Sequence, residues 1–296
     1  MVKAIIDLGT NTFNLLIAEV YDSKFRILHS SKIGVALGMG GILKKQISDD
    51  AFMRGYNALA EFKAICNEFD VQELRALGTS ALRDAKNTPQ FTQKVKNELD
   101  LNIEVIDGIK EAELIYSGVK LTFSFDRPAM IMDIGGGSTE FIYANKNGIE
   151  YLTSLNIGVS RLYQEIHTSD PLTKEDIKQI EFWLQERAGD FFTNREAELL
   201  IGASGTFETF YELIFDTIFD PTQENIALSR DQLEDCLEKI ISSTQKQRDL
   251  NDRIIPIRKK MAPISAVKTR WVLEQLNTRE ILISPYSLKE GALFSF

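Results

Sequence analysis

Short apolar runs and longer stretches with helical spacing alternate along this chain, and they do so in the same order twice. In each half, three apolar runs separated by polar turns come first, and helical spacing then alternates with further apolar runs. The runs predict strands at 2–7, 13–21, 24–29, 73–79, 103–106, 129–133, 139–144, 150–155, 199–202 and 280–284. The spacing predicts helices behind an N-cap at Ser48 and behind the small-residue turn 203–206, and at 80–85, 88–99, 108–121, 159–167, 172–188, 230–243, 265–276 and 288–294. The polar segment 246–263 contains two prolines and is predicted to be a loop.

One glycine turn occurs twice, as Ile6-Asp7-Leu8-Gly9-Thr10-Asn11 and as Met132-Asp133-Ile134-Gly135-Gly136-Gly137-Ser138. The two aspartates are 126 positions apart, and a second matching pair, Gly78 and Gly202 at strand ends, has an offset of 124. Two separate features with nearly the same offset indicate a duplicated domain. We expect domains at 1–122 and 123–285, with a C-terminal helix within 286–296 that packs back on the first domain.

The repeated order of elements also predicts a fold class. Three antiparallel strands followed by alternating helices and strands are the plan of the ribonuclease-H-like fold, which is shared by actin, sugar kinases and heat-shock ATPases. Open α/β sheets bind ligands beyond the carboxyl ends of their strands. The sequence therefore predicts an α/β protein of two duplicated ribonuclease-H-like domains, with the ligand in a cleft between them.

Composition excludes several function classes. The chain has 296 residues and a net charge of −9, which argues against general nucleic-acid binding because a phosphate backbone needs a basic face. No apolar run approaches the length of a membrane span, and the N-terminus enters a strand directly without a signal peptide. Cys66 and Cys236 are expected to be buried reduced thiols, so a cytoplasmic location is expected, as a monomer or a homodimer. With only two histidines, a zinc site or a Ser-His triad is not expected.

The two turns carry the candidate binding chemistry. Asp7 and Asp133 would hold a divalent cation, Mg²⁺ or Mn²⁺, while the backbone of Gly9, Thr10 and Asn11 and of residues 135–138 would hold phosphate oxygens. Taken alone, the first turn fits an ordinary hairpin with turn-favouring residues better than a phosphate grip. Three consecutive glycines at Gly135, Gly136 and Gly137, followed by Ser138, are hard to explain unless something approaches the backbone closely.

Arg83 and two glutamates follow the predicted strands of the first half. The planar guanidinium of Arg83 suits a phosphate chain, but it could equally pair with Asp84 or Glu113 on a helix surface. Glu111 and Glu113 stand in the first turn of a predicted helix, where carboxylates commonly complement the helix dipole. Alternatively, one of them takes a proton from water that attacks phosphorus, and spacing alone does not choose between them.

In the second half, Glu140 lies in a strand where an unpaired carboxylate is costly, which favours a function or a partner. Ser204 and Gly205 open a predicted helix. Their backbone N–H groups could contact phosphate or a nucleotide base edge, or the segment could simply be a capped helix start.

In order along the chain, these segments resemble the exopolyphosphatase / guanosine pentaphosphatase (Ppx/GppA) phosphatase family, in its short two-domain form. The resemblance covers essentially the whole chain and rests on residues 6–13, 78–85, 108–116, 133–140, 202–206 and 288–293. It implies that Glu111 is the catalytic base, Glu140 a second essential carboxylate, Asp133 a metal-associated residue, and Arg83 and Asn11 phosphate contacts. The chain departs from the family pattern at Lys110, where a glutamate is usual, near Ala36, where an arginine is often found, and in 261–267, which lacks a glycine turn.

The resemblance implies Mg-dependent release of terminal phosphate from inorganic polyphosphate, guanosine pentaphosphate or both, by in-line attack of water. The chain ends at Phe296, shortly after the two core domains, whereas longer members carry a further helical domain. A preference for short polyphosphate chains is therefore expected. Two alternatives stay open: a polyphosphate or alarmone sensor with little turnover, to which Lys110 lends weight, and an ATP-dependent kinase on the same fold.

Overall fold

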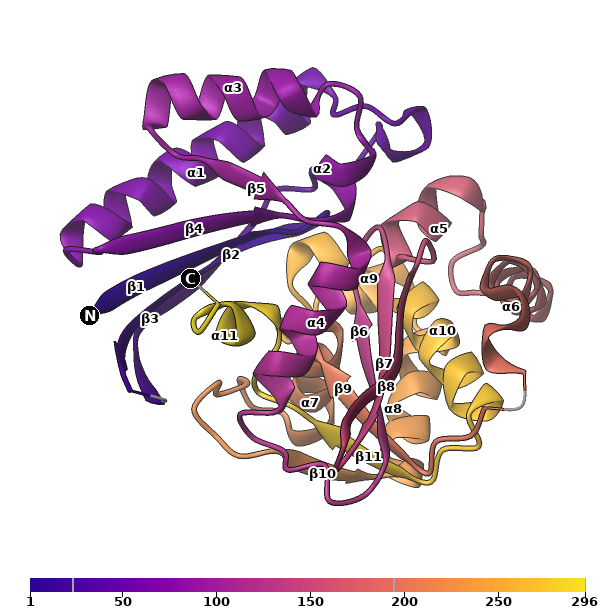
Figure 1. Cartoon of the computed structure of the whole chain (residues 1–296). Helices are drawn as coiled ribbons and strands as arrows, with labels where there is room; N and C mark the ends of the chain where they lie inside the picture. The colour runs from indigo at the N-terminus through magenta and orange to yellow at the C-terminus, as the bar shows by residue number, and fades with distance from the viewer. Residues whose placement is uncertain (23, 194, 296) are drawn as a thin grey trace. The chain divides into compact units, whose positions relative to one another are not determined.

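The computed structural model describes residues 1–22, 24–193 and 195–295, and the chain divides into two compact units (Figure 1). Unit 1 comprises Met1–Gly118 together with the residues from Ser287 onward, and unit 2 comprises Val119–Tyr286. The first boundary thus falls after residue 118, a few residues before the expected 122. The second falls after residue 286, one residue beyond the expected 285. Phe296, the last residue of the expected C-terminal segment, lies outside the described residues.

Unit 1 is a five-stranded sheet with helices on both faces. Its strands are β1 (Val2–Leu8), β2 (Thr12–Tyr21), β3 (Lys24–Gly34), β4 (Glu73–Gly78) and β5 (Ile103–Val105). Its helical elements are η1 (Ile42–Lys44), α1 (Asp49–Glu68), α2 (Ser80–Asp84), α3 (Thr88–Leu99), α4 (Gly108–Val119) and α11 (Leu288–Ala292). The strand order is β3-β2-β1-β4-β5; β1–β2 and β2–β3 pair antiparallel, whereas β1–β4 and β4–β5 pair parallel.

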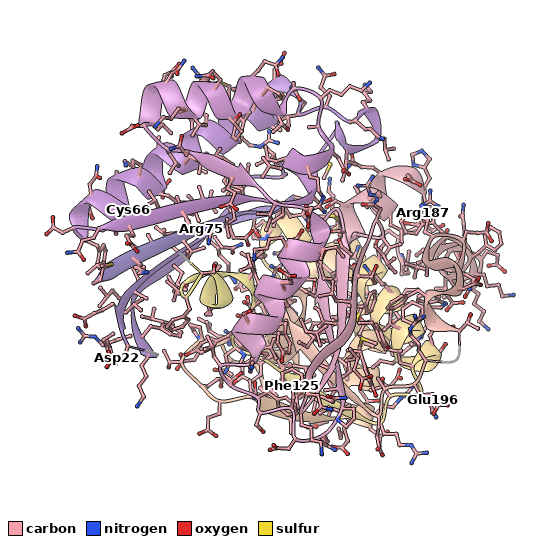
Figure 2. All side chains as sticks on the ribbon, in the orientation of Figure 1. Asp22, Cys66, Arg75, Phe125, Arg187 and Glu196 are labelled. Atoms are coloured by element: carbon pink, nitrogen blue, oxygen red, sulfur yellow. The ribbon has the colours of Figure 1, made fainter. Side chains whose placement is uncertain are left out.

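Local sequence explains the helices of unit 1. The side chain of Ser48 accepts a hydrogen bond from the Ala51 amide, as expected of an N-cap, and α1 then buries an apolar stripe that includes Leu59 and Phe62. Helices α1 and α3 lie together on one face of the sheet, while α11 packs against β1 and β2 (Figure 1). After α11 in the chain comes Ser295, whose carbonyl accepts a 2.8 Å hydrogen bond from Arg75 of β4. This bond ties the C-terminal segment to the sheet (Arg75 is labelled in Figure 2).

Unit 2 repeats this plan with one additional strand. Its strands are β6 (Ala129–Ile134), β7 (Thr139–Asn145), β8 (Gly148–Leu155), β9 (Leu199–Ala203), β10 (Ile226–Ser229) and β11 (Glu280–Ile283). Its helical elements are α5 (Val159–Glu165), α6 (Lys174–Ala188), η2 (Gly189–Phe192), α7 (Ser204–Phe215), α8 (Arg230–Ser242), α9 (Gln245–Asp249), η3 (Pro256–Arg258) and α10 (Ala262–Gln275). Read from β8, the order is β8-β7-β6-β9-β11-β10, with β6–β9 and β9–β11 parallel. The central strand β6 is buried along its whole length, and α10 packs against α5, α6 and α8.

Both sheets therefore have the ribonuclease-H-like order of three antiparallel strands followed by two parallel ones. This topology confirms the predicted α/β fold class of two duplicated domains. The predicted cleft stays a prediction. Within the described residues, no helix combines the length and the apolar character that crossing a membrane requires.

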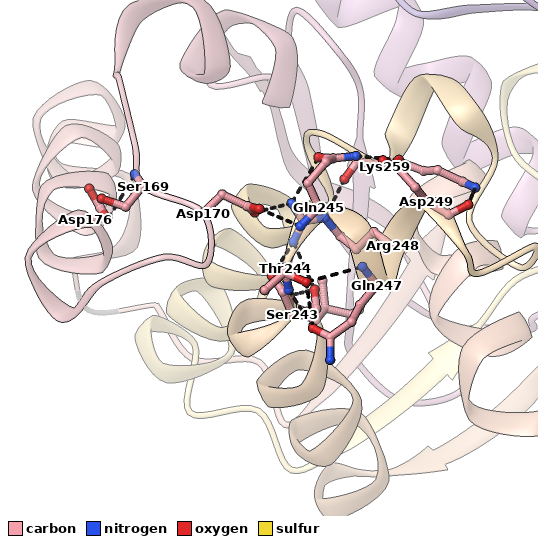
Figure 3. Close-up of polar contacts among 11 residues, drawn as sticks. Ser169, Asp170, Asp176, Ser243, Thr244, Gln245, Gln247, Arg248, Asp249 and Lys259 are labelled. Atoms are coloured by element: carbon pink, nitrogen blue, oxygen red, sulfur yellow. Dashed lines mark hydrogen bonds and ion pairs between the residues drawn. The ribbon is translucent and has the colours of Figure 1, made fainter.

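The prediction of a loop over 246–263 is correct only in part: residues 250–255 and 259–261 lie outside the helices, but α9, η3 and the start of α10 occupy the rest. Thr244 forms a capping box with Gln247, so helix α9 begins directly behind it, and α10 already begins at Ala262. Arg248 of α9 is buried, and it donates to Asp170 at 2.5 Å and to the Lys259 carbonyl at 2.7 Å (Figure 3). These long-range contacts order a segment whose polar composition is typical of a loop. Strand β10 was likewise not expected, because its four residues gain strand geometry only by pairing with β11.

Candidate functional site

The first glycine turn joins β1 to β2, with Asp7 one residue before the end of β1. The Asp7 carboxylate accepts a 3.0 Å hydrogen bond from Nδ2 of Asn14, its direct partner across the two strands. The carbonyls of Thr10 and Asn11 accept from the backbone amides of residues 35, 36 and 38, at 2.8 to 3.1 Å. The segment that follows β3 thus packs against the carbonyl side of the turn.

The second turn joins β6 to β7 and is held in the same way. The carbonyls of Gly135, Gly136 and Gly137 accept from the amides of residues 158–161, at 2.8 to 3.3 Å. These amides include the first N–H groups of α5, which have no partner within the helix. The approach requires glycine at Gly158, because a Cβ there would lie 2.3 Å from the backbone of Gly136.

The two turns are geometric equivalents. A Cβ on Gly9 would lie 2.8 Å from the Thr12 carbonyl oxygen, and one on Gly135 would lie 3.0 Å from that of Ser138. In each turn, the segment after the third strand covers the carbonyls. Since the C=O and N–H of one trans peptide point in opposite directions, the amides of Asn11 and of residues 136–138 are directed to the other side, whereas the Gly9 amide donates to the Thr12 carbonyl at 3.1 Å. A turn built in this way offers N–H groups to an anion.

Asp133 lies at the start of the second turn and contacts the beginning of α7. Its Oδ1 accepts a 2.5 Å hydrogen bond from Oγ of Ser204. Ser204 has φ of +64°, a left-handed conformation that costs a non-glycine residue about 1–3 kcal/mol. The hydroxyl therefore does not cap the helix but orients the aspartate.

An arginine side chain binds the backbone of Gly205, the next residue. Arg258 of η3 donates from Nη1 to the Gly205 carbonyl at 2.5 Å and to Thr209 at 3.0 Å, and a Cβ on Gly205 would collide with its guanidinium. Removal from bulk water lowers the pKa of Arg258, while the carboxylates of Glu208, Glu212 and Asp133 oppose this shift. The sequence interpretation missed Arg258 because it falls in the segment predicted to be a loop.

Arg83 and Glu111 form the polar pair of unit 1. Nη1 of Arg83 lies 3.1 Å from Oε2 of Glu111 and donates to the Ile106 carbonyl at 3.0 Å. Glu111 is 8% exposed, whereas Glu113 is exposed and lies 3.4 Å from Lys110. The two glutamates that spacing did not separate thus have different environments. Arg83 follows the end of β4, where Thr79 donates its amide to the Leu8 carbonyl at the end of β1, beside the first turn.

Glu140 is the second residue of β7, shortly after the second turn, and only 1% of it is exposed. Its Oε1 accepts a 2.6 Å hydrogen bond from Ser154 of β8. A buried lysine of α10, Lys268, supports the same turn. It donates hydrogen bonds to Oγ1 of Thr139 and to the Ile157 carbonyl. The sequence interpretation missed Lys268, although a lysine within an apolar helical stretch is a visible signal.

The residues predicted from sequence therefore form a local group in each unit. In unit 2, the structure brings Asp133, Ser204 and the start of α7 to the turn 135–138, with Glu140 next to it. In unit 1, it pairs Arg83 with Glu111 and places Asp7, Gly9, Thr10 and Asn11 on one turn.

The donor set suits a magnesium ion. Within 1–22, 24–193 and 195–295, no three His, Cys, Asp or Glu side chains gather as a self-sufficient metal cage. Mg²⁺ is commonly held by only one or two carboxylates together with water and substrate phosphate. Asp7 and Asp133 provide one carboxylate at each glycine turn, so the residues present fit this mode of binding.

Comparison with known proteins shows which family the chain belongs to. The chain matches an exopolyphosphatase from Cytophaga hutchinsonii with 34% identity and a TM-score of 0.96, covering 100% of this chain and 97% of that one. It also matches a PPX-GPPA enzyme of Aquifex aeolicus with 26% identity and a TM-score of 0.83, covering 100% and 99% of the two chains. A guanosine-5′-triphosphate,3′-diphosphate pyrophosphatase of Pseudoalteromonas atlantica is 28% identical over 98% of this chain, which spans only 58% of that relative's length. Residues 16–296 match the family model, and the chain belongs to the Ppx/GppA phosphatase family.

Proposed function

We propose that this protein is a phosphohydrolase that releases terminal phosphate from inorganic polyphosphate, guanosine pentaphosphate or both, by in-line attack of water. The similar proteins named above are an exopolyphosphatase and a guanosine pentaphosphate pyrophosphatase, so both phosphoanhydrides are candidate substrates. Each presents a terminal phosphoryl group with several anionic oxygens.

The observation that carries this proposal is the pair of equivalent glycine turns. In both, backbone hydrogen bonds occupy the carbonyls at 2.8 to 3.3 Å, and the amides of the same peptides, those of Asn11 and of residues 136–138, are directed to the opposite side. Fixed N–H groups stabilise a phosphoryl group without reorganising during the reaction. A metal-free hairpin with ordinary turn chemistry would not need the three consecutive glycines of 135–137 or the close approach of Gly158.

Glu111 is the proposed general base. It is buried at the start of α4, and the ion pair with Arg83 fixes the direction of its carboxylate. Both polar contacts of Arg83 use Nη1, so the rest of its fork can bond a phosphate oxygen while Nη1 holds Glu111. Glu140 is the proposed second carboxylate, and it would orient the water or a phosphate ligand from the end of the second turn.

Asp7 and Asp133 are the proposed Mg²⁺ ligands, and Mn²⁺ would fit the same oxygen donors. When bound, the ion would neutralise phosphate charge. The Ser204 hydroxyl donates to Oδ1 of Asp133 and so fixes the direction of this carboxylate. Ser138, with Ser204 and Gly205, would complete the phosphate contacts on unit 2.

A sensor with weak turnover is the second candidate, and the Arg83–Glu111 ion pair is the observation that favours it. The ion pair engages the carboxylate that would take a proton from water, and this would slow proton transfer. The decisive assay measures phosphate release, with and without Mg²⁺, from short polyphosphate, long polyphosphate and guanosine pentaphosphate. Release that depends on Mg²⁺ supports the hydrolase, whereas tight binding of any of the three without release supports the sensor. ADP formation from ATP would instead support a kinase.

A further inference from the structure

Lys268 is the most deeply buried cation of unit 2. It lies in the middle of α10, where residues 262–269 are all buried, and none of its surface is exposed. Burying an ammonium group is expensive unless it is paired and hydrogen-bonded. Its partners therefore indicate what it does.

Two segments meet at its ammonium group. Nζ donates to Oγ1 of Thr139, the first residue of β7, and to the carbonyl of Ile157 at 2.6 Å. Thr139 directly follows the turn 135–138, and Ile157 directly precedes Gly158, whose own amide donates to Gly137. The ammonium thus bonds the residues next to both halves of the hydrogen-bonded turn.

Two carboxylates flank the turn that this ammonium supports. Asp133 and Glu140 are directly opposed across β6 and β7, and both are buried. Like charges at directly opposed strand positions repel each other. Burial lowers the pKa of Lys268 to about 7, while the charges of Glu140 and Asp133 raise it, so the three groups interact.

Unit 1 provides a comparison within the same chain. Its register equivalent of Glu140 is Asn14, a neutral amide that donates to Asp7. At this position, the first hairpin therefore pairs one carboxylate with a hydrogen-bond donor. The second hairpin has replaced the donor with another carboxylate, and so it needs a cation from elsewhere.

We propose that Lys268 is a positioning residue of the second turn: its ammonium joins Thr139 to Ile157 and supplies the positive charge that lets Asp133 and Glu140 stand opposite each other as carboxylates. This role rests on the proposed function, because it matters for activity only if the turn holds phosphate. Lys268 itself has no contact with substrate.

The first test is a double-mutant cycle on stability. Lys268→Met keeps most of the length of the side chain but removes the charge, so unfolding should occur at a lower urea concentration. Glu140→Gln should destabilise the unchanged protein, which keeps a buried cation, yet restore stability in the Lys268→Met background. We expect a coupling of about 10-fold in the unfolding equilibrium constant. Additive effects would overturn the proposal, as would failure of Glu140→Gln to rescue a Lys268→Met chain that does not fold.

The second test separates positioning from general stability. Arg270→Met removes a cation from the same helix, one that pairs at 3.2 Å with Glu238 on the surface. Below the melting temperature, Lys268→Met should lower kcat/KM for polyphosphate by about 10-fold or more, and Arg270→Met should leave it unchanged. Equal kcat/KM in both variants would refute the positioning role. If the unchanged protein releases no phosphate, the proposed function fails, while the stability cycle still tests the charge coupling by itself.

Discussion

Asn14 and Glu140 occupy the same register position in the two hairpins, each directly opposite the turn aspartate of its own unit. In unit 1, the Asn14 amide donates to the Asp7 carboxylate at 3.0 Å. In unit 2, a carboxylate stands in that place and is held by Ser154 at 2.6 Å, with Lys268 nearby. The duplicated hairpin is thus asymmetric: in one copy a neutral amide stands opposite the aspartate, and in the other a second carboxyl group does.

Glu111 and Glu113 give the most direct test of the proposed base. Glu111→Gln should lower turnover by about 10²-fold or more, because the amide cannot take a proton from water, while binding of substrate changes only a few-fold. Glu113→Gln is the matched control: its side chain is exposed beside Lys110, and activity should be retained. An inactive Glu113→Gln together with an active Glu111→Gln would reverse the assignment.

Metal removal tests the two turn aspartates. EDTA should abolish phosphate release, and added Mg²⁺ or Mn²⁺ should restore it. Asp133→Asn should need a higher Mg²⁺ concentration for half-maximal activity, because it loses the charged donor but keeps the shape. Full activity in metal-free buffer would remove both aspartates from the mechanism.

Gly158 tests whether the second turn must be held from behind. Alanine there would place its Cβ 2.3 Å from the Gly136 backbone, so the turn or α5 must shift. We expect kcat/KM to fall by about 10²-fold, since small misplacement of binding groups is costly. Gly55→Ala is the control. Its Cβ would meet side-chain atoms at 3.1 to 3.3 Å in the middle of α1, where alanine also favours the helix, and activity should be retained. A fully active Gly158→Ala would show that the close approach is not required.

The two cysteines predict a pH dependence of stability. Burial raises the pKa of Cys66 to about 11 and that of Cys236 to about 12, from an ordinary value of 9.0. Because the folded thiols keep their protons, their contribution is fully present below pH 9.0 and is lost as the pH rises toward 11 and 12. The free energy of unfolding should therefore fall above pH 9. In the Cys66→Ala variant, it should fall less steeply with pH. Thiol-specific reagents should react at neutral pH only after unfolding, and rapid labelling of the native protein would contradict this.

Charge predicts how long polyphosphate is processed. Acidic residues outnumber basic ones by 43 to 34, so the part of a long polyanion that lies outside the site meets a repulsive surface. Hydrolysis should be distributive and more efficient on short chains, and added salt should narrow the difference. On a gel, a ladder of gradually shortened chains supports this prediction. Full-length chains that coexist only with free phosphate would contradict it.

The sequence by itself determined the plan of the fold. Alternating apolar runs and helical spacing located the strands of both sheets except β10, because half-buried strands and amphipathic helices have different periods. The repeated Asp-x-Gly turn pointed to the candidate binding site, because glycine is needed wherever one backbone approaches another closely. Ser48 was correctly expected to cap α1, since a cap acts within three residues of itself.

Only the tertiary structure decided which side chains meet. It paired Glu111 rather than Glu113 with Arg83, because helix rotation turns one carboxylate inward and the other toward solvent. It also brought Arg258 onto Gly205, and Lys268 to Thr139, across 53 and 129 residues. Such contacts depend on where α10 and η3 pack, and packing is decided by burial of the whole apolar surface, not by neighbours along the chain.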